Sequence, residues 1–386
     1  MPTKILVVDD EPDLELLISH HYKKRVRDNE LQFSFAQNGV QALQKLQAGG
    51  EVDVVLTDIN MPEMDGLTLL VKLNEHYPLL RTVIISAYGD MANIRKALNH
   101  GAFDFVTKPI DFDDLDATLD KTIQESKARK QAVKDHDQLV ALQRELDLAR
   151  HIQKSMVPKI FPPFPERKEF EIHAEMIPAR EVGGDFYDFF LIDDARLGVV
   201  IGDVSGKSVP AALFMAVSKT VLKSTALKGL PPEECLQQVN RILCLESVEE
   251  MFVTVFYGIL NFRTGEVTYC NGGHNPPYLL RNDGHVEITN KTDGLLLGIH
   301  ENWSYRAKRI TLQPGDGLIL YTDGVTEALS HENNQYTEAR LATYLKHCNG
   351  SAPPDIIRGL VEEVRQFSGD AQQADDITIL ALKYWG

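Results

Sequence analysis

Aspartates recur in this chain where apolar runs meet turns, and they fall into two groups. The first group lies in "ILVVDDEPD" and "VVLTDINMPEMDG" and comprises Asp9, Asp10 and Asp58. The second lies in "EVGGDFYD", "VVIGDVSGKS", "LILYTDGVTEA" and "ADDITIL" and comprises Asp185, Asp203, Asp323, Asp375 and Asp376. An aspartate at the tip of a buried strand loses hydration unless a positive group lies beside it. The pattern therefore predicts two metal sites.

The first group has the residue types that phosphoryl chemistry requires. Oxygen-only ligands suit Mg²⁺, which keeps a coordination position for a phosphate oxygen. Lys108, in "VTKP", supplies a positive charge for a phosphoryl oxygen, and Ser86, at the end of "VIISA", offers a hydroxyl. A helix N-cap would explain Asp10 alone. It does not explain Asp10, Asp58, Ser86 and Lys108 together, so the set favours a phosphoryl-accepting site.

Residues 1–123 contain the elements that must position this first group. Short apolar runs such as "KILVVD", "DVVLTD" and "RTVIIS" alternate with segments of helical spacing, for example Leu14–Val26 and Gly39–Leu46. Strand–helix alternation with nearly continuous apolar strands predicts a parallel sheet covered on both faces. Ligands of such sheets bind at the carboxyl ends of the strands, where the first aspartates lie.

With these motifs, residues 1–123 resemble the receiver domain of two-component response regulators, a flavodoxin-like α/β fold with five parallel strands. The resemblance implies that Asp58 accepts a phosphoryl group from the phosphohistidine of a histidine kinase. Ser86 and Phe105 match the hydroxyl and aromatic switch positions of that family. The implied Mg²⁺ ligands are Asp10, Asp58 and the backbone carbonyl of Asn60, with Asp9 acting mostly through water.

The segment from Asp111 to Met156 contains no glycine and no proline and is rich in charge. Apolar residues recur in it at 3–4–3 spacing, at Leu139, Leu142, Leu146 and Ala149, and Met156 continues the register. Such a seam predicts a helix that pairs with a second copy of itself, as in a coiled coil. A solvated helix lying on its own domains is the alternative. Prolines from Pro158 onward end the helix.

From about residue 168 the pattern changes to strand pairs such as "FVTVFYGILN" and "EVTYCNGG", which predict an α+β domain. Helical stretches are expected at Val209–Leu227, Pro232–Leu245 and Pro354–Phe367. The second group of aspartates lies at strand ends in this region, beside glycines that allow the backbone to approach an ion closely. Since no histidine or cysteine cluster accompanies them, the pattern favours Mg²⁺ or Mn²⁺ over zinc. Two such ions activate a bridging water and hold a phosphoryl group for in-line attack.

Residues from about 145 to the end resemble the metal-dependent protein phosphatase (PPM) family, in its SpoIIE/RsbU-like branch. The resemblance is carried by "ELDLARHIQKSMVP", "PAREVGGDFYDFF", "GDVSGKSVPAALFMA", "NGGHNPPYLL", "LQPGDGLILYTDGVTEA" and "ADDITILALK". It implies an antiparallel β-sandwich flanked by helices that hydrolyses protein phosphoserine or phosphothreonine with two Mn²⁺ or Mg²⁺. The implied ligands are Asp185, Asp203, the Val204 carbonyl, Asp323 and Asp375, with Asp376 as an adjacent candidate that sequence cannot separate from Asp375.

Ordinary turn chemistry would explain any single glycine-flanked aspartate, Asp323 above all. Ser208 departs from the family, which usually has glycine there, and we expect its hydroxyl to cap the following helix. His274, in "GGHNPP", is expected to shape a loop rather than to bind metal.

Composition limits the remaining function classes. The formal net charge of −16 and the pI near 5.2 argue against a nucleic-acid-binding surface. The four cysteines are scattered without a CxxC pair, and no apolar run is long enough to span a bilayer. A strand-like run begins within the first few residues of the sequence. A cytoplasmic protein without membrane contact is therefore expected.

Together these patterns predict a receiver domain (1–123), a helical linker (124–157) and a phosphatase domain (158–386). Phosphorylation of Asp58 would control hydrolysis, and the resemblance suggests a serine-phosphorylated STAS-domain protein, an anti-sigma factor antagonist, as the substrate in a partner-switching pathway. A homodimer through the linker helix is expected. The alternative is an inactive phosphatase fold that sequesters a partner when the receiver is phosphorylated.

Overall fold

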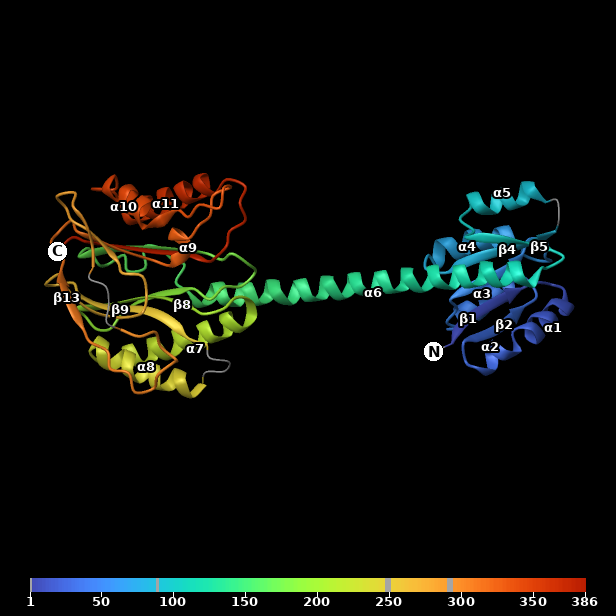
Figure 1. The fold of residues 1–386 in the computed structure, drawn as a ribbon, viewed down its shortest axis with the longest axis horizontal. Coiled ribbons are helices and arrows are strands. Elements are labelled where there is room, and N and C mark those ends of the chain that lie inside the picture. The colour runs from blue at the N-terminus through green and yellow to red at the C-terminus, as the bar shows by residue number, and fades with distance from the viewer. Residues whose placement is uncertain (1, 88–89, 247–250, 290–293) are drawn as a thin grey trace. The chain divides into compact units, whose positions relative to one another are not determined.

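The computed structural model describes residues 2–87, 90–246, 251–289 and 294–386. Its contacts divide the chain into two compact units, Met1–Leu142 and Gln143–Gly386. This division falls inside the stretch 124–157 that the sequence assigns to the linker. Each unit has a sheet architecture of its own, and both architectures agree with the predicted fold classes (Figure 1).

The first unit contains one parallel sheet with the strand order β2-β1-β3-β4-β5. Its strands are β1 (Thr3–Val8), β2 (Leu31–Ala36), β3 (Val54–Asp58), β4 (Arg81–Ala87) and β5 (Asp104–Lys108). The helices are α1 (Pro12–His21), α2 (Lys23–Arg27), α3 (Gly39–Gln47), α4 (Gly66–His76), α5 (Met91–Asn99) and the start of α6 (Phe112–Met156). The helix predicted over Leu14–Val26 is therefore two helices that meet at the buried Tyr22.

Helices cover both faces of this sheet, as the apolar strands require. Buried residues of α1 and α6 pack on one face, and those of α3 and α4 pack on the other. The carboxyl ends of β1 and β3 are adjacent because these strands pair in parallel register. The sheet therefore brings the first group of aspartates to one edge.

Helix α6 is continuous over 45 residues, beginning in the first unit and ending in the second. Its first part packs on the first unit, where Ser126 Oγ donates to the carbonyl of Asp53 over 3.0 Å and Lys130 pairs with the Asp53 carboxylate. Its middle turns are solvated, and the seam residues Leu139 and Leu142 are 65% and 53% exposed. The first two seam residues thus form an exposed apolar stripe, whereas Leu146, Ala149 and Met156 are half-buried.

The second unit is a sandwich of two antiparallel five-stranded sheets, with orders β13-β10-β9-β8-β7 and β12-β11-β14-β15-β6. The first sheet is built from β7 (Phe186–Leu191), β8 (Arg196–Val204), β9 (Val253–Asn261), β10 (Glu266–Gly272) and β13 (Lys308–Thr311). The second is built from β6 (Phe170–Ile177), β11 (Tyr278–Leu280), β12 (Val286–Ile288), β14 (Gly317–Tyr321) and β15 (Ile377–Tyr384). Side chains from both sheets form one buried core between them.

Helices lie on the outer faces of this sandwich (Figure 1). Helices α7 (Ser208–Ala226) and α8 (Pro232–Glu246) contact the first sheet, and α11 (Pro353–Ser368) contacts the second. These three agree closely with the predicted stretches. The short helix α9 (Asp323–Thr326) and helix α10 (Thr337–Lys346) were not predicted. Among the described residues, no helix has the length and apolar character needed to cross a membrane.

Candidate metal centres in the two units

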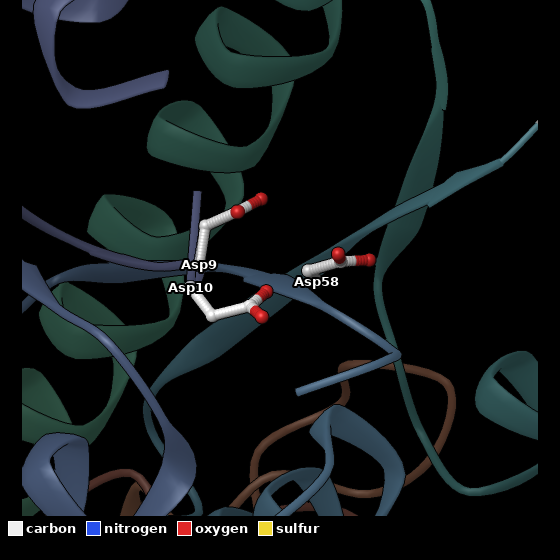
Figure 2. Close-up of side chains that lie close together, drawn as sticks. All are labelled: Asp9, Asp10 and Asp58. Atoms are coloured by element: carbon white, nitrogen blue, oxygen red, sulfur yellow. The ribbon is translucent and has the colours of Figure 1, made fainter. Parts of the chain in front are cut away.

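The first candidate centre lies at the carboxyl ends of β1 and β3. Asp58 is the last residue of β3, and Asp9 and Asp10 follow β1 directly. Each of the three residues offers a carboxylate oxygen that lies within 4.8 Å of the other two. Figure 2 shows the three side chains gathered at this edge. Oxygen donors at this spacing fit a hard divalent cation such as Mg²⁺.

Lys108, the last residue of β5, bridges these carboxylates. Its Nζ lies 3.0 Å from Asp9 Oδ2, 3.0 Å from Asp58 Oδ2 and 2.9 Å from Glu11 Oε1. Partial burial opposes the charge on Lys108, but hydrogen bonds to Glu11, Asp9 and Asp58 outweigh it and raise the pKa of the ammonium group. Burial raises the pKa of Asp9, against the effect of Lys108. Glu11 was not anticipated as a partner, because its side chain reaches Lys108 only in the folded sheet.

The other residues predicted for this centre lie around its edge. Ser86 is fully buried on β4, one residue after Ile85, which is the register partner of Asp58. Its Oγ makes no hydrogen bond within the part of the chain that the structure describes. Phe105 is half-buried on β5, and Asn60 is exposed just after β3. A buried hydroxyl with unused hydrogen-bonding capacity beside Asp58 fits a site that receives a further polar group.

The second group of aspartates comes from both sheets of the second unit. Asp185 directly precedes β7, and Asp203 lies near the end of β8 in the same sheet. In the other sheet, Asp323 follows β14 as the first residue of α9, and Asp375 lies just before β15. The sandwich therefore collects at one end carboxylates that are up to 190 residues apart in sequence.

These carboxylates raise one another's pKa values. Burial raises the pKa of Asp185 well above its usual range, and the charges of Asp203 and Asp376 add to the effect. Burial and the neighbouring Asp323 raise the pKa of Asp203 to about 7, although a hydrogen bond with Asp185 opposes the shift. Burial also raises the pKa of Asp323, with smaller effects from Glu327 and Asp375. The centre therefore holds excess negative charge that bound protons or cations must neutralise.

The geometry separates Asp376 from Asp375. Asp376 is buried, and its carboxylate accepts hydrogen bonds from the backbone N–H of Ala179 over 2.8 Å and of Gly184 over 2.7 Å. Asp375 is half-exposed, and its Oδ2 lies 3.0 Å from Lys207 Nζ. The backbone thus already engages Asp376, whereas Asp375 contacts a half-exposed lysine that a metal ion could replace.

The Gly183–Gly184 turn needs its glycines because other groups approach the backbone closely. A Cβ at Gly183 would overlap the Asp376 carboxylate, and one at Gly184 would lie 2.7 Å from the carbonyl oxygen of Val204. The glycine at position 184 thus leaves space beside the Val204 carbonyl, which is the predicted backbone ligand.

The arrangement of the second centre is looser than that of the first. Within the described ranges, only the Asp9–Asp10–Asp58 group has three ligand oxygens all within 4.8 Å of one another. Lys207 also donates to the carbonyl of Ala374 over 2.7 Å, so its ammonium group partly occupies the rim of the second centre. Carboxylates and a backbone carbonyl are oxygen donors of the kind that Mg²⁺ and Mn²⁺ prefer, so the donor set fits these ions.

Sequence reasoning missed two residues that the structure places beside the second centre. Arg180, from "PAREVGGD", donates from Nη1 to Ser208 Oγ over 3.1 Å. The expectation that Ser208 caps its own helix is therefore wrong: α7 begins at Ser208, with Lys207 at the cap position. The side chain of Gln153 is buried and bonds both the carbonyl and the N–H of Gly183, over 2.6 and 3.1 Å. A glutamine in the otherwise apolar seam register was the signal that could have identified it.

Comparison with known families agrees with this division of the chain. A model of the response regulator receiver domain matches residues 5–120. A model of Stage II sporulation protein E (SpoIIE) matches residues 193–385, which is half of the chain. The chain belongs to the SpoIIE family. Both predicted resemblances, to receivers and to SpoIIE-like phosphatases, are thereby confirmed.

Individual relatives of this SpoIIE-family chain cover it in part. Protein IcfG of Synechocystis sp. is 31% identical over 265 residues, which make up 62% of this chain and 41% of IcfG. Phosphoserine phosphatase RsbU of Bacillus subtilis is 27% identical over 276 residues, 70% of this chain and 80% of RsbU. The SiaA-PP2C domain of Pseudomonas aeruginosa shares the fold, with a TM-score of 0.54 at 20% identity over 64% of this chain and 98% of that domain. This chain thus spans less than half of the length of IcfG.

Proposed function

We propose that this SpoIIE-family chain is a response regulator whose output is metal-dependent hydrolysis of phosphoserine or phosphothreonine on a protein. The observation that carries the proposal is the convergence of Asp185, Asp203 and Asp323 from two sheets. Burial and the charges of neighbouring carboxylates raise the pKa values of all three. A structural role alone does not account for so much buried negative charge at one end of a sandwich. The similarity to phosphoserine phosphatase RsbU supports the same reaction.

In this proposal the ligands of two Mn²⁺ or Mg²⁺ ions are Asp185, Asp203, the Val204 carbonyl, Asp323 and Asp375. Bound ions would supply the acidity that turns a water into a nucleophile at neutral pH. Asp376 would act differently, because its carboxylate holds the backbone N–H groups of the Gly183–Gly184 turn. Arg180 lies at the rim and can hold a substrate phosphoryl group by a bidentate contact.

In the receiver, we assign Asp58 as the phosphoacceptor, with a histidine kinase as the phosphodonor. Asp9, Asp10 and the Asn60 carbonyl would complete a Mg²⁺ site beside it. Lys108 already contacts Asp58 and would hold one phosphoryl oxygen. The Ser86 hydroxyl, which has no hydrogen bond among the described residues, would hold a second phosphoryl oxygen. Phe105 would change position together with Ser86.

Helix α6 is the proposed route of control. Each unit bonds its own end of the helix: Ser126 and Lys130 bond to Asp53 in the first, and Gln153 bonds to Gly183 in the second. Gly183 lies two residues before Asp185, so a shift of the last helical turn moves the backbone that positions a proposed metal ligand. The exposed stripe that includes Leu139 and Leu142 is apolar enough to pair with a second copy, which supports a homodimer.

We further propose that the substrate is a small STAS-domain protein phosphorylated on serine, as in partner-switching pathways. The competing function is an inactive adaptor that binds such a protein without hydrolysing it. The looser spacing of the second group of aspartates is the observation that favours this alternative. Hydrolysis assays separate the two, since an adaptor binds the phosphoprotein and leaves its phosphate in place.

The test measures phosphate release from candidate phosphorylated STAS proteins by the full chain, with and without Mn²⁺. Asp203→Ala and Asp323→Ala should each abolish release, whereas Asp194→Ala, a fully exposed carboxylate in the same unit, should not change it. Control by the receiver is tested with a small phosphodonor, in wild type and in Asp58→Ala. Equal rates in all four of these conditions would refute control through Asp58, and metal-independent release would refute the proposed chemistry.

A further inference from the structure

His274 is a buried histidine close to the second candidate centre, and the proposed chemistry gives it no role. Its side chain is 5% exposed, and burial lowers its pKa to about 4, so the ring is neutral at ordinary pH. A neutral imidazole has one N–H donor and one acceptor nitrogen, and burying it costs free energy unless these are used. The contacts of its two nitrogens therefore show what the residue does.

A rigid turn holds the backbone of His274. Asn271 brackets this turn: its Oδ1 accepts from the N–H of His274 over 2.7 Å, and its Nδ2 donates to the carbonyl of His274 over 2.9 Å. Gly273 has a φ of +78°, which favours glycine, and added side-chain atoms there would meet Leu296. The motif "NGGH" thus positions the ring from a turn that has little freedom to move.

The ring of His274 points toward Thr254 on β9, the strand that pairs with the one carrying Asp203. Its Nδ1 lies 2.8 Å from the hydroxyl oxygen of Thr254, on β9. The same hydroxyl lies 3.5 Å from the backbone carbonyl of Asp203, and Thr254 is the register partner of Asp203 in the β8–β9 ladder. A chain of contacts therefore leads from the NGGH turn through one hydroxyl to the backbone of a proposed metal ligand.

The second ring nitrogen faces the other sheet. The backbone of Tyr321, the last residue of β14, lies near the ring. Nε2 has no well-formed hydrogen bond in the described part of the chain, so we assign the proton to Nδ1, which donates to the Thr254 hydroxyl while that hydroxyl donates to the Asp203 carbonyl. Tyr321 precedes Asp323 by two residues, so His274 lies between the strand ends that deliver Asp203 and Asp323.

We propose that His274 is a positioning residue for the metal centre: through the Thr254 hydroxyl it fixes the backbone at Asp203 and Val204. This inference rests on the proposed function, because it assumes that these residues bind metal. His274 itself touches no proposed ligand, so its effect passes through Thr254. Groups that orient metal ligands in this indirect way commonly change metal affinity about 10- to 100-fold when they are removed.

The test is Mn²⁺ affinity, measured by isothermal titration calorimetry on the full chain. All variants carry Asp10→Asn, which removes the receiver site from the titration, and Asp203→Ala defines the baseline. Thr254→Val keeps the shape of the side chain and removes the hydroxyl, and it should weaken Mn²⁺ binding about tenfold. His274→Leu should weaken binding equally, and the double variant should be no worse than either single variant.

Two further substitutions separate positioning from simple packing. An asparagine amide can reach the location of Nδ1, whereas a glutamine amide reaches that of Nε2. His274→Asn should therefore keep Mn²⁺ affinity within about threefold of the parent, and His274→Gln should lose about as much as His274→Leu. Thr225→Val, at a buried threonine on α7 away from the centre, is the matched control and should leave Mn²⁺ affinity unchanged.

The outcomes distinguish this inference from the proposed function. If Thr254→Val, or a folded His274→Leu, binds Mn²⁺ as tightly as the parent, the inference is wrong even when the enzyme is active. Additive losses in the double variant would also overturn it, because they would give His274 an effect independent of Thr254. A parent chain that binds Mn²⁺ but releases no phosphate would instead refute the proposed hydrolysis and leave the positioning role standing.

Discussion

Replacing Asp375 and Asp376 one at a time should have opposite consequences. The two residues are neighbours in "ADDITIL", yet one carboxylate is half-exposed beside Lys207 and the other is buried on backbone N–H groups. We expect Asp376→Ala to destabilise the second unit, and Asp375→Ala to remove Mn²⁺ binding while leaving the fold almost unchanged.

The magnitude for Asp376 follows from its contacts. Asp376→Ala leaves the N–H groups of Ala179 and Gly184 without their acceptor, and each such loss to a charged partner costs about 1.5–3 kcal/mol. Relief of the repulsion between Asp376 and Asp185 offsets part of this cost. The two losses together cost about 3–6 kcal/mol, so the free energy of unfolding should fall by somewhat less than this amount.

For Asp375 the expected loss of stability is small. Its contact with Lys207 joins two side chains that are 40% and 46% exposed, and pairs of this kind contribute under about 1 kcal/mol. Loss of the carboxylate also reduces the repulsion that raises the pKa values of Asp203 and Asp323. The free energy of unfolding without metal should thus change by less than about 1 kcal/mol, in either direction.

The assay is urea unfolding in EDTA, followed by tryptophan fluorescence. The chain has two tryptophans, Trp303 and Trp385, and both lie in the second unit, so the signal reports on that unit alone. Calorimetric Mn²⁺ titration in the Asp10→Asn background then measures metal affinity. The assignment would be refuted if Asp375→Ala unfolded as easily as Asp376→Ala, or if Asp375→Ala kept parental Mn²⁺ affinity.

Three further outcomes are expected. In EDTA the second unit should lose about 1 kcal/mol of stability between pH 6 and pH 8. The pKa of Asp203 is about 7 in the folded state and 3.8 in the unfolded state, so folding takes up a proton at low pH. This contribution to stability is lost as the pH rises through 7. Urea titrations at both pH values measure this loss, and an unchanged pH dependence in Asp203→Asn would contradict its cause. Lys108→Met should strengthen Mg²⁺ binding by the receiver about tenfold, because it removes a cation that lies 3.0 Å from two carboxylates. The same substitution should slow phosphorylation by a small phosphodonor. Weaker Mg²⁺ binding in calorimetry would count against this reasoning. Arg180→Ala should raise KM for a phosphoprotein about tenfold while Mn²⁺ affinity stays constant, and an unchanged KM would show that Arg180 does not hold the phosphoryl group.

Much of the first centre could be predicted from sequence because the receiver sheet is parallel and its order is simple. In such a sheet, residues at the ends of apolar runs lie on one edge, so Asp9, Asp58 and Lys108 could be placed together from strand patterns alone. The contact between Lys108 and Glu11 could not, because it depends on the direction of a side chain outside the strands.

The second centre was predictable in its residue types but not in its internal arrangement. Asp375 and Asp376 are equivalent in sequence, and only the position of the Gly183–Gly184 turn, almost 200 residues away, assigns them different partners. Ser208 was expected to cap its helix because local sequence favours caps, but Arg180 lies beside its hydroxyl in the folded unit.

The sequence by itself determined the two fold classes, the helical segment between them and the carboxylates able to bind divalent ions, since periodicity and residue chemistry are local properties. Only the tertiary structure decided that Asp376 binds backbone N–H groups whereas Asp375 contacts Lys207, that Gln153 near the end of α6 bonds to Gly183, and that His274 faces Thr254. The physical reason is that hydrogen-bond partners and burial depend on segments far apart in the chain, which folding alone brings within about 3 Å of one another.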